Sequence, residues 1–204
     1  MIEFLFSQYK DYSNFLIALE LIAVVFGVIS VLFARKNNIL VYPTGLVSTI
    51  LYVYILFEFQ LYGDLIINFY YTIMSFLGWY LWSKTKSGAE EFSISTINRK
   101  EFLISTLIFT ITLTFIVLVY HFFDKFTHWT AYVDALTTGL FFVGMWLMAK
   151  RKIENWILWI IADAISIPLY FYKGLTFSSF QFVLFTIIAI LGYKEWKRFL
   201  QKTI

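Results

Sequence analysis

The sequence contains no cysteine, and it holds only two histidines and two prolines among its 204 residues. The lack of cysteine excludes a disulfide framework, a thiolate metal site and a cysteine nucleophile. His121 and His128 alone are poor material for a zinc site or a Ser/His relay. A G-x-x-x-x-G-K-[ST] phosphate loop and a nucleophile elbow are also missing. We therefore expect no metal, no cofactor, no ATP-driven step and no enzymatic activity.

Charged residues are scarce as well. They make up 14% of the chain, whereas 60% is hydrophobic, 22% is aromatic and the mean hydropathy is +0.76. A soluble domain carries about 25% charged residues. This composition leaves too little polar surface to cover a soluble fold, so we expect the lipid bilayer to be the protein's main partner. A net charge of +3 is too small to indicate nucleic acid.

Long apolar runs dominate the chain, and each has about the 20 residues that a helix needs to cross the hydrocarbon core. The runs are continuously apolar and lack the alternation of a membrane barrel. The sequence predicts an all-α integral membrane protein with seven transmembrane helices and, at its first residues, no removable signal peptide. The predicted spans are 14–34, 39–57, 63–83, 102–120, 130–149, 155–172 and 175–193.

Lysine and arginine are distributed unevenly between the predicted loops. With seven spans, only Lys10, Lys125 and Lys173 fall on the side of the N-terminus, and the rest of the 16 basic residues fall on the other side. Cytoplasmic loops carry the excess of Lys and Arg. We therefore expect a multi-pass protein of the bacterial inner or plasma membrane, with its N-terminus outside and its C-terminus in the cytoplasm.

The chain also contains an internal repeat. Residues 37–54 align with 155–172 at an offset of 118, including an LY-x-Y pair, and G-x-x-x-W endings align at an offset of 114. This predicts two three-helix repeats, 14–84 and 130–198, joined by a polar loop and a fourth helix in 85–129. Such a parallel 3+1+3 repeat is the SWEET-like arrangement of transporters that bind substrate near mid-membrane and use alternating access.

Polar side chains inside the predicted spans are candidate substrate contacts, because ionisable groups there are costly. Asn155, Trp159 and Asp163 follow one another at four-residue intervals and so share one helical face. An indole face beside a carboxylate is suited to a flat cationic ring. An alternative role for Asp163 is to carry a proton in coupled transport.

Further candidates lie on other predicted spans: Asp64, Asn68 and Tyr71 on 63–83, Gln181 on 175–193, and Ser48 on 39–57. Two other interpretations stay open, a helix-end role for Asp64 and interhelical hydrogen bonds for Asn68 and Gln181. Aromatic residues gather at membrane interfaces. On that basis we expect an aromatic belt formed by Trp79, Trp82, Trp146 and Trp196.

The motifs ENW-x-x-W, LY-x-YKGL and GY-x-x-W within 154–198, together with QLYGDLIINFYYTIMSFLGWYLW at 60–82, resemble the PnuC-type vitamin transporters. The resemblance covers nearly the whole chain. It implies a SWEET-like duplicated bundle and places Asn155, Trp159 and Asn68 in the binding site. It also marks two departures, since the nicotinamide riboside members have Gln at the position of Asn68 and Tyr at that of Phe182.

The function that this resemblance implies is uptake of nicotinamide riboside by facilitated diffusion, with the substrate trapped through phosphorylation by a cytoplasmic kinase. The alternatives are a thiamine transporter of the same family and a proton-coupled vitamin carrier that uses Asp163. A receptor or scaffold that binds a ligand without moving it is disfavoured, because no large soluble domain is present. The sequence leaves open whether the protein assembles as a homo-oligomer.

Overall fold

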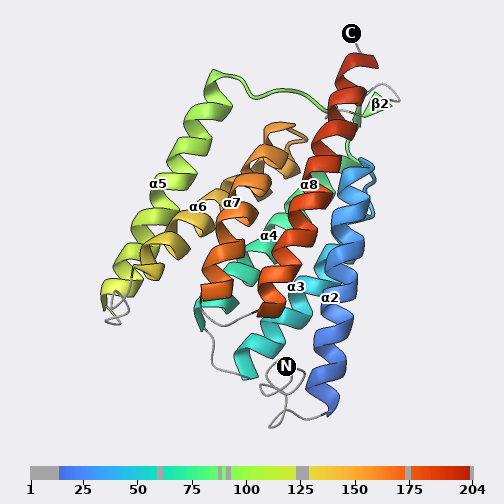
Figure 1. Cartoon of the computed structure of the whole chain (residues 1–204). Helices are drawn as coiled ribbons and strands as arrows, with labels where there is room; N and C mark the ends of the chain where they lie inside the picture. The colour runs from blue at the N-terminus through green and yellow to red at the C-terminus, as the bar shows by residue number, and fades with distance from the viewer. Residues whose placement is uncertain are drawn as a thin grey trace. The chain divides into compact units, whose positions relative to one another are not determined.

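The computed structural model describes residues 14–58, 62–86, 89–90, 93–122, 129–172 and 176–202. The side chains of residues 62–64, 85–86, 89–90, 176–178 and 202 lie outside this description. Within it the chain is helical apart from turns and short extended pieces (Figure 1). The helices are α2 (Asn14–Arg35), α3 (Val41–Glu58), α4 (Tyr62–Ser83), α5 (Arg99–Phe122), α6 (Thr130–Ala149), α7 (Glu154–Tyr172) and α8 (Thr176–Lys202).

The seven helices of the described residues confirm the predicted all-α fold. Five of them, α2, α3, α5, α6 and α7, are long and apolar enough over their described residues to cross a membrane. The predicted polar loop adds a small feature that the sequence analysis did not anticipate. Two strands of two residues, β1 (Thr85–Lys86) and β2 (Ala89–Glu90), pair antiparallel there.

The chain divides into two compact units. The first unit spans Met1–Ser83 and contains α2, α3 and α4; the second spans Lys84–Ile204 and contains α5 to α8. In the first unit α3 packs against both α2 and α4. In the second unit α6 packs against α5 and α7, and α7 also packs against α8. The division into two repeats and a connecting segment at 85–129 stays a prediction.

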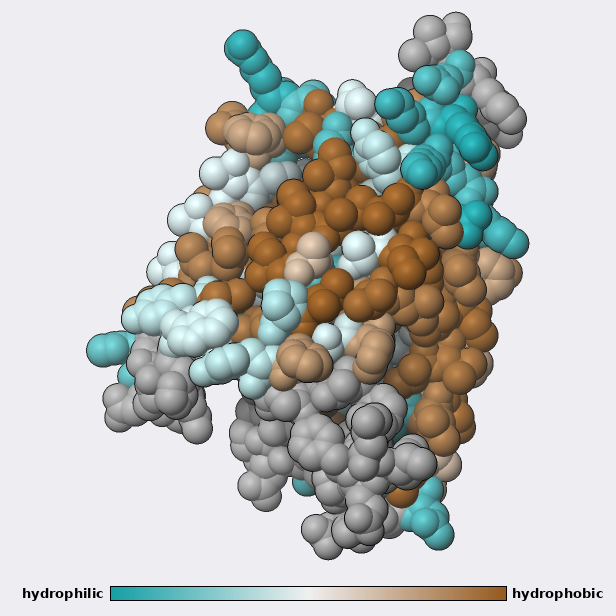
Figure 2. Space-filling model, in the orientation of Figure 1, coloured by the Kyte–Doolittle hydropathy of each residue, from teal (hydrophilic) through white to brown (hydrophobic). Residues whose placement is uncertain are grey.

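Apolar side chains cover the outer surfaces of the helices, as expected of a protein whose solvent is lipid. None of the described residues of α5 is buried, and Leu103, Leu107 and Leu118 on that helix are largely exposed. Figure 2 shows hydrophobic residues over most of the visible face and hydrophilic residues gathered near the C-terminal end of α8. That end carries the exposed residues Lys194, Lys197 and Arg198.

The linkers α2–α3 and α6–α7 have the same backbone geometry. Asn37 and Arg151 both adopt a left-handed conformation with φ of 52°, which a non-glycine residue seldom takes. Asn38 N–H donates to the Phe33 carbonyl over 3.0 Å, and Lys152 N–H donates to the Leu147 carbonyl over 2.9 Å. Both linkers therefore reverse the chain through the same turn. Equivalent residues of the two turns are separated by 114 positions in the sequence.

The helix bounds follow the same offset of 114. α4 begins at Tyr62 and α8 at Thr176, and α3 and α7 end at Glu58 and Tyr172. The offset of 118 proposed for the first helix of each repeat is therefore wrong for the structure, and no four-residue gap is needed. The matching LY-x-Y letters therefore do not occupy equivalent positions in the two turns and helices. The duplication gains support, while the arrangement of its copies about an axis stays a prediction.

Two tryptophans predicted for the interfacial belt are instead buried. Trp82 and Trp196 expose only 3% and 0% of their surface, and each meets an aromatic ring edge to face. The ring centroids of Tyr42 and Trp82 are 5.1 Å apart, and those of Trp156 and Trp196 are 5.6 Å apart. Each pair lies beside a glycine that leaves room for it, Gly78 in the first unit and Gly192 in the second. The belt prediction is wrong for these two residues, whereas Trp79 is exposed as expected.

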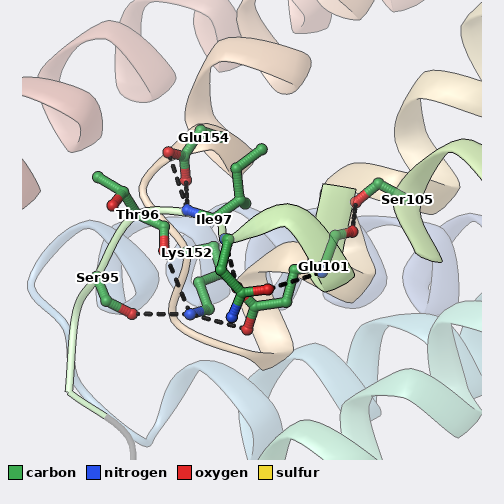
Figure 3. Close-up of polar contacts among 8 residues, drawn as sticks. Ser95, Thr96, Ile97, Glu101, Ser105, Lys152 and Glu154 are labelled. Carbon is green, nitrogen blue, oxygen red and sulfur yellow. Dashed lines mark hydrogen bonds and ion pairs between the residues drawn. The ribbon is translucent and has the colours of Figure 1, made fainter. Parts of the chain in front are cut away.

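A polar clamp holds the α6–α7 linker of the second unit (Figure 3). We define the linker clamp as residues 95–97 and Glu101 in contact with Lys152 and Glu154. Ser95 forms a parallel bridge with Lys152: its N–H donates to the Arg151 carbonyl, and its own carbonyl accepts from Ile153 N–H. Backbone pairing thus ties the segment before α5 to the turn between α6 and α7.

Side chains reinforce the linker clamp. Lys152 Nζ lies 2.9 Å from Glu101 Oε1 and donates to Ser95 Oγ over 3.0 Å. Ile97 N–H donates to both carboxylate oxygens of Glu154. Asn98 and Glu101 accept from each other's backbone N–H over 2.9 Å, which is a capping box at the start of α5. The clamp thereby fixes the start of α5 to the turn between the end of α6 and the start of α7.

Candidate functional site: the polar face of α7

One face of α7 is both polar and buried. Asn155, Asp163 and Ser166 expose 0%, 1% and 0% of their surface, although all three lie in a helix that is otherwise apolar. We call these three residues the α7 polar face. The opposite side of the helix presents exposed Ile157 and Ile161. The predicted polar stripe is therefore directed into the protein rather than into lipid.

Three acceptor atoms of the α7 polar face have no hydrogen-bond partner among the described residues. They are Asn155 Oδ1, Asp163 Oδ1 and Ser166 Oγ. The amide of Asn155 is itself held in place, because its Nδ2 donates to the Lys152 carbonyl over 2.6 Å. A buried polar atom without a partner costs about 1–3 kcal/mol. Acceptors in this state along one helical face are candidates for contact with a ligand that carries hydrogen-bond donors.

Trp159 lies between Asn155 and Asp163 on the same helix and packs against α6. A methyl group built on Gly144 would lie 3.3 Å from the indole Nε1, so the indole rests directly on that glycine. The ring of Phe141, one turn earlier on α6, has its centroid 5.3 Å from that of Trp159 at an interplanar angle of 42°. The indole is thus supported from α6 and remains half-buried.

The aromatic contacts extend from Trp159 to α8. Phe141 stacks on Phe182 with centroids 6.2 Å apart and an interplanar angle of 17°, and Phe182 meets Tyr170 at 4.9 Å. We call Trp159, Phe141, Phe182 and Tyr170 the aromatic row. Sequence reasoning missed Phe141, because nothing in a helix rich in apolar residues distinguishes the one that touches the indole. Its three-residue spacing from Gly144 is the only signal that the sequence offers.

The other predicted contacts are distributed over both units. In the second unit Gln181 is half-buried on α8, directly before Phe182. In the first unit Asn68 and Tyr71 are half-buried on α4, and Ser48 is buried on α3. A methyl group on Gly27 would lie 3.0 Å from Ser48 Oγ, so Ser48 faces α2. The side chain of Asp64 lies outside the described residues. The structure brings Asn155, Trp159 and Asp163 together on one face, and the role of each stays a prediction.

This arrangement can recognise a flat, positively charged ring. The indole face of Trp159 attracts a cation through its π-electrons, and the carboxyl of Asp163 lies one turn further along the same face. The free acceptors of Asn155 and Ser166 are suited to hydroxyl or amide donors. A buried polar site in a bundle of lipid-facing helices defines a class of protein, the membrane transporters of small molecules.

Comparison with known proteins narrows this class. The profile of the nicotinamide mononucleotide transporter family matches residues 17–198, and the chain belongs to that family. It is a multi-pass membrane protein of a family of transporters rather than of enzymes.

Relatives of known name are distant but cover most of the chain. The nicotinamide riboside transporter PnuC of Escherichia coli K12 is 26% identical over 205 residues, which span 87% of this chain and 84% of that protein. PnuC of Neisseria mucosa is 25% identical over 194 residues, 89% of this chain and 72% of that protein. The riboflavin/roseoflavin transporter RibM of Streptomyces davaonensis is 23% identical over 124 residues, which span 58% of this chain and 56% of RibM.

A solved structure has the same fold. The crystal structure of the vitamin B3 transporter PnuC matches with a TM-score of 0.69 and 23% identity, covering 98% of this chain and 90% of that chain. At this identity the likeness establishes the fold and leaves the substrate to be argued from the site.

Proposed function

We propose that the protein is a nicotinamide riboside transporter that takes up its substrate by facilitated diffusion with alternating access. The observation that carries the proposal is the α7 polar face, where buried acceptors without partners lie beside a supported indole. Nicotinamide riboside has a flat cationic ring, an amide and sugar hydroxyls, which correspond to these groups. The relatives named for this vitamin support the same substrate.

Three residues of α7 have a specific role in the proposed site. Trp159 stacks on the pyridinium ring, and Asp163 stabilises its positive charge. Asn155 accepts a hydrogen bond from the amide or the sugar. The remaining predicted contacts are Asn68, Tyr71, Gln181, Ser48 and Asp64.

The proposal also includes orientation and coupling. The excess of Lys and Arg places the N-terminus outside and the C-terminus in the cytoplasm of a bacterial inner or plasma membrane. A cytoplasmic kinase that phosphorylates the vitamin makes uptake by diffusion effectively one-way, because the added phosphate converts the substrate into a different, negatively charged molecule. Assembly as a homo-oligomer remains a proposal of the sequence alone.

Thiamine is the second candidate substrate, since it also carries a cationic aromatic ring. Asn68 and Phe182 depart from the Gln and Tyr expected of nicotinamide riboside members, which leaves room for a ligand of different shape. Titration of the purified protein with both vitamins decides between them. Tighter binding of nicotinamide riboside supports the proposal, and equal or tighter binding of thiamine contradicts it.

Transport itself is tested by counterflow of radiolabelled nicotinamide riboside in liposomes. A facilitated-diffusion carrier exchanges label without any ion gradient. Binding without exchange would identify a receptor instead. Exchange that requires a pH gradient, and that is lost in Asp163→Asn, would identify a proton-coupled carrier.

A further inference from the structure

The indole of Trp159 has a close neighbour on α6 that no motif singled out. A methyl group on Gly144 would lie 3.3 Å from Nε1, 3.4 Å from Cε2 and 3.6 Å from Cδ1 of the indole. The contact with Nε1 is tighter than an ordinary van der Waals distance, and the other two are ordinary contacts. Any side chain at position 144 therefore moves the indole by a few tenths of an ångström away from α6.

Phe141 contacts the same indole from the preceding turn of α6. Residues three apart share a helical face, so Gly144 and Phe141 support Trp159 from one side. Phe141 is itself braced by its stacked contact with Phe182 on α8. Together the two residues fix how deep the indole lies and how its plane is tilted.

In the first unit, the contact between α2 and α3 is equivalent to that between α6 and α7 but has different side chains. Ser30, Gly27 and Gly45 stand 114 residues before Gly144, Phe141 and Trp159. A methyl group on Gly45 would lie 3.0 Å from Ser30 Oγ, so the larger residue is on α2 and the glycine on α3. Where α2 crosses α3, the first helix carries a side chain and the second helix carries a glycine. Gly144 is therefore required by the indole and not by the crossing of the helices.

We infer that Gly144 and Phe141 are positioning residues that set the place of the Trp159 indole and thereby determine which aromatic ring the site accepts. The inference rests on the proposed function of α7 as the ring-binding helix. Neither residue needs to touch the substrate, since each acts through Trp159. A displaced indole changes the gap available to a single-ring cation, such as a pyridinium nucleoside, relative to a larger ring system.

The test compares Gly144→Ala with a matched control, Gly139→Ala, on the same helix. A methyl group on Gly139 would lie 2.9 Å from Phe109, so the control crowds its surroundings more than Gly144→Ala does. Affinities for nicotinamide riboside, thiamine and riboflavin are measured by titration of each full-length protein. Thermal unfolding of the same samples separates loss of stability from loss of recognition.

We expect Gly144→Ala to weaken binding of nicotinamide riboside about tenfold, which corresponds to about 1.4 kcal/mol, and to change its affinity ratio to riboflavin. Gly139→Ala should lower the unfolding temperature and leave all three affinities unchanged. In a Trp159→Leu background, Gly144→Ala should have no further effect on binding, because the two residues act as one pair. Should Gly144→Ala fail to fold, Phe141→Leu provides the same comparison, with about fivefold weaker binding.

Three results would overturn the inference: unchanged binding in Gly144→Ala, equal losses of affinity in both glycine variants, or a full additive effect in the Trp159→Leu background. Failure of the proposed function is distinguishable. A wild-type protein that binds thiamine or riboflavin but no nicotinamide riboside contradicts the assigned substrate, and the same variants then test the positioning role on the vitamin that binds. Wild-type protein that binds none of the three contradicts both proposals.

Discussion

The two three-helix segments, α2–α4 and α6–α8, share a backbone plan and differ in what fills it. Their linkers turn through the same left-handed residue, and a glycine in each receives an aromatic ring. At the crossing of their first two helices the first unit has Gly27, Ser30 and Gly45, whereas the second has Phe141, Gly144 and Trp159. The comparison teaches that the two segments share the turn between their first two helices, while the aromatic side chains proposed to bind the ring lie in only one of them.

The two segments also differ at the position of the acidic residue Asp163. The position equivalent to Asp163 is Thr49, whose hydroxyl lies within 3.4 Å of the Leu46 carbonyl in its own helix. Asp163 is buried with an acceptor that has no partner among the described residues. The polar group of the first segment is therefore satisfied locally, whereas that of the second belongs to the proposed binding site.

The largest effect is expected where the two segments differ most. Trp159→Ala removes the indole of the proposed site and should weaken nicotinamide riboside binding about 30-fold, since a desolvated cation–π contact is worth about 2 kcal/mol. Trp79→Ala is the matched control, because that indole is exposed on the first unit. Titration calorimetry on both variants measures the effect. Comparable losses in the two would end the claim that α7 holds the ring.

A smaller loss is expected from Asp163→Asn, which keeps the shape of the side chain and removes its charge. We expect about fivefold weaker binding of the cationic vitamin, because hydrogen bonds to charged groups are stronger than neutral ones by about 1 kcal/mol. Riboflavin, which carries no positive charge, should lose much less affinity and serves as the internal control. Equal losses for charged and uncharged ligands would assign Asp163 a structural role.

The shared glycine contacts should respond alike in both units. Alanine at Gly78 or at Gly192 crowds Tyr42 or Trp156, and overpacking of this kind costs about 1–3 kcal/mol. Thermal unfolding in detergent should therefore show a similar decrease for each variant, with nicotinamide riboside affinity retained at low temperature. A decrease in only one of them would break the equivalence of the two helix pairs.

The smallest effect is expected at the linker clamp. Lys152→Met removes the ion pair with Glu101 and the hydrogen bond to Ser95, and should cost about 1 kcal/mol of stability. Lys36→Met in the linker of the first unit is the control, since Lys36 is exposed. The unfolding temperatures of the two variants provide the measurement. A larger decrease in Lys36→Met would show that the first linker carries the more important contact.

Much of the fold follows from hydrophobic runs that are each about long enough to cross the bilayer. The predicted span 14–34 corresponds to α2 at Asn14–Arg35, and 130–149 coincides with α6. The register of the repeat could not be read from letters alone, because Leu, Ile and Tyr recur by chance in apolar helices. The left-handed turns at Asn37 and Arg151 fix the true offset, and their residue types differ.

The site was only partly predictable for a related reason. Asn155 and Asp163 stood out because polar groups are costly in lipid, and their burial agrees with that expectation. Trp82 and Trp196 were misassigned, since a tryptophan near a span end has the same local sequence signal whether it faces lipid headgroups or an aromatic ring of a neighbouring helix. Phe141 carries no such signal, and only three-dimensional contact reveals its role beside Trp159.

A structure of the protein with nicotinamide riboside bound tests the central claim most directly. The account predicts that the pyridinium ring lies on the Trp159 indole, with the carboxyl of Asp163 close to the ring and Asn155 Oδ1 accepting a hydrogen bond. A ligand held by α2 and α3 alone, without contact to α7, would contradict it.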